Sequence, residues 1–307
     1  MTGIHSKHTV TVLLLASFAG SVITLRRLDR MRPHATLEEV LYVPSPAVLN
    51  RLSLGYNALL ADVYWTRVVQ YFGSRHAANS MEYKLLYPLL DIATTLDPRL
   101  IPAYDFGSVF LAQNAPQGAG DPRAAVRLLE RGIRQNPREW RLYQDLGFIY
   151  YVELKDYTAA GKAFQQGAMI PGAHPFLQVL AARTLQHGGD YQTSELLWRS
   201  LYESSNDAAI RKNALKHLRA VLVDETVTTL ERAIELFKGR YGRLPASLND
   251  LVSGGVISNV PRDPRGYFYE LLPGGHVQVH DYIELPYITK GLPPGQQPSD
   301  FDLSSNP

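Results

Sequence analysis

Two histidines near the C-terminus are the residues whose spacing could support chemistry. His276 and His280 lie in the segment "HVQVHDYIEL" (276–285), whose alternation predicts a β-strand. Residues an even number apart project from one face of a strand, so both imidazoles would lie on one side, next to Asp281. A metal site needs at least one further ligand from elsewhere in the chain. We therefore interpret them as exposed histidines of a strand.

The other titratable residues show no catalytic pattern. Asp224, Glu225, Glu231 and Glu235 lie close together, which is typical of the solvated face of a helix. The chain has no Gly-rich phosphate loop, nucleophile elbow or metalloprotease helix. It also has no cysteine, which excludes disulfides, thiolate metal sites and cysteine nucleophiles. The sequence therefore predicts a protein that is not an enzyme and that uses no metal or cofactor.

The composition is that of a folded protein without a strong electrostatic field. Hydrophobic residues make up 45% and charged residues 20%, so most of the chain can build a core. The net charge of +2 does not attract a polyanion, and nucleic acid is not an expected partner.

The N-terminal region, residues 1–32, predicts a membrane anchor. Residues 9–25, "TVTVLLLASFAGSVITL", carry no charge, and "RRLDRMR" follows at once. A helix of this length spans about 25 Å, enough for the hydrocarbon core of a bilayer. Two alternatives are a signal peptide cleaved near Ser17 and Ala19 and a buried helix of a soluble protein.

The middle of the chain, residues 52–224, predicts an array of amphipathic helices. A proline-containing linker at 33–51 precedes it, and helices at 52–72 and 83–97 form its first pair. Three segments repeat one pattern of small and apolar residues and end near a proline: "LLYPLLDIATTLDP" (85–98), "AAVRLLERGIRQNP" (124–137) and "TAAGKAFQQGAMIPG" (158–172). A further unit covers 176–202, and the period is about 34 residues.

These repeats resemble the tetratricopeptide repeat (TPR) family. The unit at 140–172 matches best, at Tyr143, Leu146, Gly147, Tyr150, Ala160 and Phe164. The resemblance implies a curved α-solenoid in which Gly147 lets paired helices approach and Phe164 fills the facing hole. It also implies that the first helix of each pair lines a groove for a protein partner, a peptide or a helix.

The groove positions implied by the resemblance mix aromatic and polar side chains. They are Tyr104, Asp105, Ser108, Arg141, Gln144, Asp145, Phe148, Tyr151, Val179, Leu180 and Arg183. Phe148 and Tyr151 are expected to need a cover. The alternatives are an external partner and an internal cover by the linker or the C-terminal module.

The C-terminal region, residues 225–290, predicts a capping helix and a small α+β module with a β-hairpin. Its motif residues are Phe237, Gly242, Leu244, Pro245, Leu248, Leu251, Asp263, Pro264, Gly266 and Tyr269. They resemble the globular part of type II secretion pseudopilins, although the calcium-binding loop of that family is missing. The tail at 291–307 is rich in Pro, Gly and Ser and is expected to be disordered.

The sequence as a whole predicts a mainly helical, membrane-anchored scaffold that binds protein and no small molecule. The pseudopilin resemblance implies a single-pass protein of the bacterial inner membrane with its C-terminal domains in the periplasm, within a secretion or pilus assembly. The arginines at 26–32 favour the opposite orientation. The alternative is a soluble periplasmic or secreted carrier of a peptide or glycan, released by signal cleavage.

Overall fold

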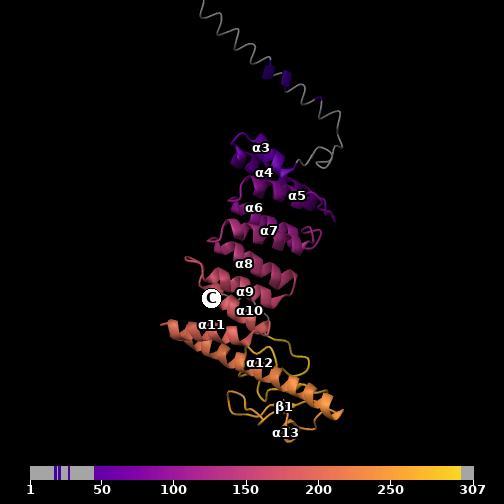
Figure 1. The fold of residues 1–307 in the computed structure, drawn as a ribbon, viewed down its shortest axis with the longest axis vertical. Helices are drawn as coiled ribbons and strands as arrows, with labels where there is room; N and C mark the ends of the chain where they lie inside the picture. The colour runs from indigo at the N-terminus through magenta and orange to yellow at the C-terminus, as the bar shows by residue number, and fades with distance from the viewer. Residues whose placement is uncertain (1–16, 19, 22–26, 28–44, 299–307) are drawn as a thin grey trace, which may run out of the picture.

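The computed structural model describes residues 17, 18, 20, 21, 27 and 45–298. This part of the chain is mainly helical, with one small two-stranded sheet near its C-terminal end. Figure 1 shows the helices stacked along one long axis, with α3 (Pro46–Leu52) at one end and α13 (Leu248–Ser253) at the other. The helices between them are α4 (Asn57–Ala77), α5 (Leu86–Leu96), α6 (Ile101–Ala112), α7 (Pro122–Gln135), α8 (Trp140–Phe148), the π-helix η1 (Ile149–Glu153), α9 (Tyr157–Ala168), α10 (Phe176–His187), α11 (Tyr191–Ser204) and α12 (Ala208–Tyr241).

Successive helices pack as pairs and form two layers. The pairs are α4 with α5, α6 with α7, α8 with α9, and α10 with α11. In addition, α6 contacts α8 and α5 contacts α7, so first helices adjoin first helices and second helices adjoin second helices. We call the outer surface of α6, α8 and α10, with the middle of α12 beside α10, the first-helix face.

Glycines set the close approach of paired helices, as the sequence predicts at Gly147. A Cβ atom added to Gly147 would overlap the ring of Phe164, which is buried against it from α9. Gly107 on α6 lies in the same way against the Leu90 side chain of α5. A bare backbone therefore meets a large apolar side chain both within the α8–α9 pair and between α5 and α6, which belong to neighbouring pairs.

Aspartates begin several of the later helices. The Asp121, Asp156 and Asp190 carboxylates accept hydrogen bonds from the backbone N–H groups three residues on, at 2.9, 2.9 and 3.2 Å. They cap α7, α9 and α11, because the first turn of a helix leaves its N–H groups without partners. This local chemistry fixes where the second helix of each pair starts.

Helix α12 joins the array to the C-terminal module without a break. It is 34 residues long, which corresponds to roughly 51 Å. The predicted division into two helices at 224/225 is wrong, because no glycine or proline lies near that point and the helix runs on to the left-handed Gly242 that ends it. Its N-terminal half packs on α11, and its C-terminal half carries the core of the module.

The C-terminal module is a hairpin and a short helix packed on α12. Strands β1 (Glu270–Leu271) and β2 (Val277–Gln278) pair antiparallel and are shorter than the sequence suggests. Phe237 of α12, Leu251 of α13 and Val279 lie in its core with Tyr269. The expected disorder of the tail does not hold at its start, because Val279 N donates to Gly291 O at 2.9 Å.

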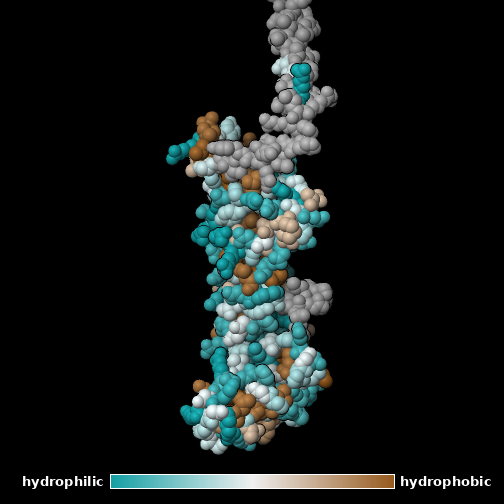
Figure 2. Space-filling view, turned by 90° about the vertical axis from the view of Figure 1, so that its right-hand side faces the viewer, coloured by the Kyte–Doolittle hydropathy of each residue, from teal (hydrophilic) through white to brown (hydrophobic). Residues whose placement is uncertain are grey.

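The N-terminal end of the described chain also differs from the expected linker. Residues 46–52 form helix α3, capped by Ser45, whose hydroxyl accepts from Val48 N at 3.4 Å. Within the described ranges, no helix has the length and apolar character needed to span a bilayer. The predicted anchor at 9–25 falls outside these ranges except for residues 17, 18, 20 and 21. Figure 2 shows a largely hydrophilic surface, with hydrophobic side chains projecting at the α3 end.

Candidate functional site on the first-helix face

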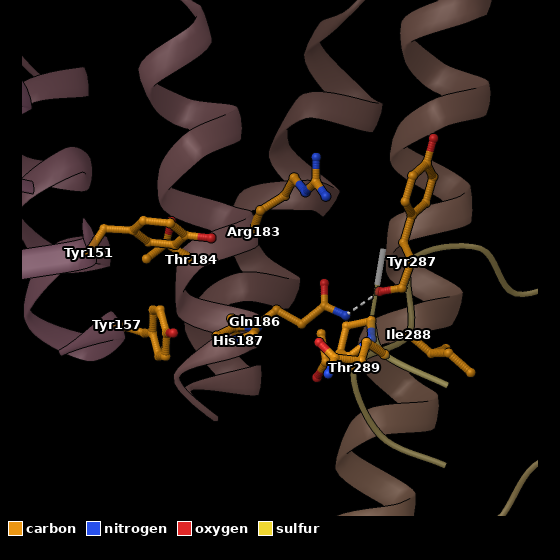
Figure 3. A pocket seen from close by; sticks show the side chains of 11 residues that line it. Tyr151, Tyr157, Arg183, Thr184, Gln186, His187, Tyr287, Ile288 and Thr289 are labelled. Atoms are coloured by element: carbon orange, nitrogen blue, oxygen red, sulfur yellow. Dashed lines mark hydrogen bonds between the residues drawn. The ribbon is translucent and has the colours of Figure 1, made fainter. Parts of the chain in front are cut away.

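The C-terminal segment folds back over the first-helix face. We call residues 285–298 the strap. It begins in the core of the module, where Leu285 and Ile288 are buried against α12, and it then crosses towards α10. Figure 3 shows Tyr287 and Thr289 of the strap facing Arg183 and Gln186 of α10.

A buried carboxylate on α12 holds the strap in place. Asp224 is fully buried and accepts hydrogen bonds from Gln186 Nε2 (2.8 Å), Thr289 Oγ1 (2.8 Å) and Thr289 N (2.9 Å to Oδ1). Lys290 N donates to the same carboxylate at 2.9 Å, and Gln186 Nε2 also donates to Tyr287 O at 3.0 Å. Burial raises the pKa of Asp224 to about 6, although all of these hydrogen bonds favour the ionised form.

A stack of three rings lies beside this carboxylate. The His217 imidazole of α12 lies between the Trp198 ring of α11, at 3.9 Å, and the Tyr287 ring of the strap, at 3.8 Å. Burial, and then the charge of Arg183, lower the pKa of His217 to about 3, so the imidazole is neutral at physiological pH. The Arg183 guanidinium lies over the Tyr287 ring, 5.8 Å from its centre.

A cavity of about 240 Å³ lies between the strap and the helices of the array. Its walls come from η1, α9, α10 and the strap, and they include Tyr151, Tyr157, Arg183, Thr184, His187 and Tyr287. The Tyr157 ring lies edge-on to His187 at 4.1 Å and to Tyr151 at 5.2 Å. The Thr184 hydroxyl on this wall is buried and has no hydrogen-bond partner. A buried polar group of this kind is stabilised when a ligand supplies the missing hydrogen bond.

Two carboxyl groups meet farther along the first-helix face. Asp145 on α8 lies beside Asp105 on α6, and its Oδ2 atom is buried without a hydrogen-bond partner. Burial, followed by the charge of Asp105, raises the pKa of Asp145 to about 8. Asp145 therefore holds a proton at neutral pH.

The structure moves two predicted groove residues into the core. Tyr104 and Ser108 are fully buried, so the expectation that they line an open groove is wrong. The Tyr104 ring packs against Gly132 of α7, and the Ser108 hydroxyl donates to Asp105 O at 2.8 Å. Tyr104 faces the partner helix α7, which the repeat pattern alone did not reveal.

The other predicted positions divide between surface and core. Arg141 is exposed and pairs with Glu139 at 3.2 Å, and Gln144 is half-buried. Phe148 turns inward, with its ring edge-on to Phe164 at 5.2 Å. Val179 packs towards Trp198, and Leu180 is buried. Tyr151 and Arg183 are thus brought together at the cavity, and Asp105 and Asp145 at the carboxyl pair.

Asp224 and its partners were missed by the sequence analysis. The assignment of Asp224 to a solvated face is wrong, since it lies on the buried face of α12, between Val223 and Val227. Glu225 and Glu235 are exposed, as expected. The available signal was an acidic residue within an apolar stripe, but its hydrogen-bond donors lie far away in the chain.

The two histidines of the hairpin pair with separate glutamates. His276 Nδ1 lies 3.6 Å from Glu231 of α12, and His280 Nδ1 lies 2.9 Å from Glu270 of β1. In residues 45–298 and the few described residues before them, no group of three or more His, Asp and Glu side chains is placed to hold a metal ion.

The chain was also compared with known proteins. No protein-family model, curated protein or solved structure matches it. Its function is therefore argued from the first-helix face, the strap and the cavity between them.

Proposed function

We propose that the protein is a membrane-tethered scaffold without catalytic activity, which binds a segment of another protein on its first-helix face. The array is TPR-like in this proposal. Support comes from the pairing of helices into two layers and from the interlocking of Gly147 with Phe164. The 9–25 run supplies the tether.

The cavity under the strap carries the proposal. Its volume of about 240 Å³ lies below the range of about 300–1,000 Å³ that is usual for small-molecule sites. It is large enough for one side chain or the end of a peptide. The Tyr151 and Tyr157 rings supply apolar contact, and the unpartnered Thr184 hydroxyl supplies a polar one.

The strap limits which part of the face is open to a partner. It covers α10 and the middle of α12 through the hydrogen bonds of Asp224 and the stacking of Tyr287 on His217. The surface of α6 and α8 remains, with the exposed Arg141 and the half-buried Gln144. The partner segment lies along α6 and α8 and ends in the cavity.

The C-terminal module has a structural role and a contact role in this proposal. It is pseudopilin-like, it caps the array through α12, and it supplies the strap. In this proposal the domains lie on the periplasmic side of a bacterial inner membrane, in a secretion or pilus assembly, and the pseudopilin resemblance of the module supports this orientation.

Site-specific photocrosslinking tests the partner site. A photoreactive p-benzoylphenylalanine replaces Gln144 on α8, and in a matched control it replaces Lys162, which is exposed on the second helix α9. In intact cells, we expect one discrete protein adduct at position 144 and none at position 162. The adduct should weaken when Tyr151→Ala is added, because that change removes a wall of the cavity. Equal adducts at both positions, or no effect of Tyr151→Ala, would contradict the proposal.

A further inference from the structure

Four large apolar side chains project together from the α3 end of the molecule. Leu52, Leu54, Tyr56 and Leu59 belong to the end of α3, the turn after it and the first turn of α4. Their exposed fractions are 68%, 86%, 70% and 63%. We call this group the hydrophobic tip. Single exposed leucines are common, but four within eight residues are a surface that needs a partner.

The backbone of the tip is held in an unfavourable conformation. Leu54 has a φ of 50°, in the left-handed region that leucine rarely adopts, and Gly55 follows with a φ of 92°. A strained, exposed leucine brings no stability to the described fold. Strain of this kind is retained where it serves a function.

A polar network beneath the turn keeps it rigid. Asn57 Nδ2 donates to Asn50 Oδ1 at 2.7 Å, which ties the start of α4 to α3. The largely buried Ser53 donates to Asn50 O at 2.8 Å and also contacts Asn57 Oδ1. Tyr56 N donates to Ser53 O at 2.8 Å. The network holds Leu54 outward before any partner arrives, so little order has to be gained on binding.

The position of the tip indicates what it contacts. The described chain enters the array at Ser45, next to α3, while the C-terminal module lies at the far end of the long axis (Figure 1). Residues 26–44 separate the array from the uncharged run at 9–25, and these 19 residues reach at most about 65 Å. The α3 end is therefore the end tied closest to the bilayer.

We infer that the hydrophobic tip inserts into the interfacial region of the same bilayer that holds the N-terminal anchor. This inference rests on the membrane tether of the proposed function. Leucine and tyrosine side chains favour the boundary between headgroups and acyl chains. A projecting turn can enter that boundary without a groove to receive it. Two attachments, the anchor and the tip, then hold the long axis of the array away from the membrane surface.

Fluorescence from a single label on the full chain tests the inference. The chain has no cysteine, so Leu54→Cys provides one site for an NBD fluorophore. Leu236→Cys is the matched control, because Leu236 is 68% exposed and lies on α12 at the opposite end of the molecule. Both proteins are reconstituted with vesicles of phosphatidylethanolamine and phosphatidylglycerol, with and without lipids that carry a shallow nitroxide quencher.

The expected result is that both proteins float with the vesicles and that only the label at position 54 is quenched and shifted to the blue. Flotation with an unquenched label at position 54 would overturn the tip and leave the tether standing. Quenching of equal size at positions 54 and 236 would also overturn it, because the contact would not belong to the tip. Failure of the full chain to float would overturn the tether and the tip together.

Discussion

Asp224→Ala is expected to release the strap from the array. The substitution removes the acceptor of four donors: Gln186 Nε2, Thr289 N, Thr289 Oγ1 and Lys290 N. Hydrogen bonds to a charged group contribute about 1.5–3 kcal/mol each, or about 6–12 kcal/mol for four. Against this, the substitution also relieves the desolvation of a buried carboxylate, and the pKa raised to about 6 shows that the hydrogen bonds offset this desolvation only in part.

Because of this partial offset, the net loss of stability is expected to fall below the sum for four hydrogen bonds, at about 3 kcal/mol. A released strap exposes its donors to water, and their hydration limits the damage. The array itself should stay folded, because its helix pairs are held by their own cores, such as Ala160 and Phe164. The loss therefore appears as local opening of the strap, as well as in overall unfolding.

Amide hydrogen exchange measures this opening directly. The Thr289 and Lys290 amides donate to Asp224, and we expect their exchange to become about 100-fold faster in Asp224→Ala, since 1.4 kcal/mol corresponds to a factor of ten. The control is Glu225→Ala, which removes the next carboxylate of α12, an exposed one. Two results would refute the reasoning: exchange rates of both amides in Asp224→Ala within about twofold of the parent, or an equal loss of protection in the Glu225→Ala control.

Three further predictions concern packing and pH. Gly147→Leu forces a side chain into the Phe164 ring and should cost about 1–3 kcal/mol or more, measured as a lower Tm, and an unchanged Tm would contradict the packing. The pKa of Asp224 is about 6 in the folded chain, which is higher than its ordinary value of 3.8. Its contribution to stability is therefore present below pH 4 and is lost as the pH rises through 6. Denaturant unfolding at several pH values should show this loss in the parent and not in Asp224→Asn. The pKa of Asp145, raised to about 8, acts in the same direction up to pH 8, and Asp145→Asn should remove the fall in stability above neutral pH, whereas an unchanged fall would show that Asp145 is not its source.

Much of the helical framework can be predicted from the sequence. The periodicity of apolar residues and the small residues at matching offsets predict paired helices, and the Gly147–Phe164 contact follows from them. Asp156 and Asp190 lie where capping residues begin a helix, so these boundaries are local as well. Such features depend on residues within one or two turns, and a single sequence contains that information.

The candidate site depends on contacts between residues that are far apart in the chain, and the sequence alone does not reveal these contacts. Periodicity alone did not place Tyr104 and Ser108 in the core, because a first helix has two faces that both carry apolar residues. Nor did it show that Asp105 and Asp145, on different helix pairs, lie together. Which residues face outward is decided by the way each pair stacks on the next.

The strap is the clearest case in which tertiary structure decides. Gln186 and Tyr287 are 101 positions apart, and Asp224 and Thr289 are 65 apart. From the sequence alone, Asp224 resembles its neighbour Glu225, since both are acidic residues on one helix. A carboxylate can be buried only where donors compensate for its lost hydration, and those donors come from α10 and from the strap. The sequence determined the helices that carry these groups, whereas only the folded chain brought the donors to the carboxylate.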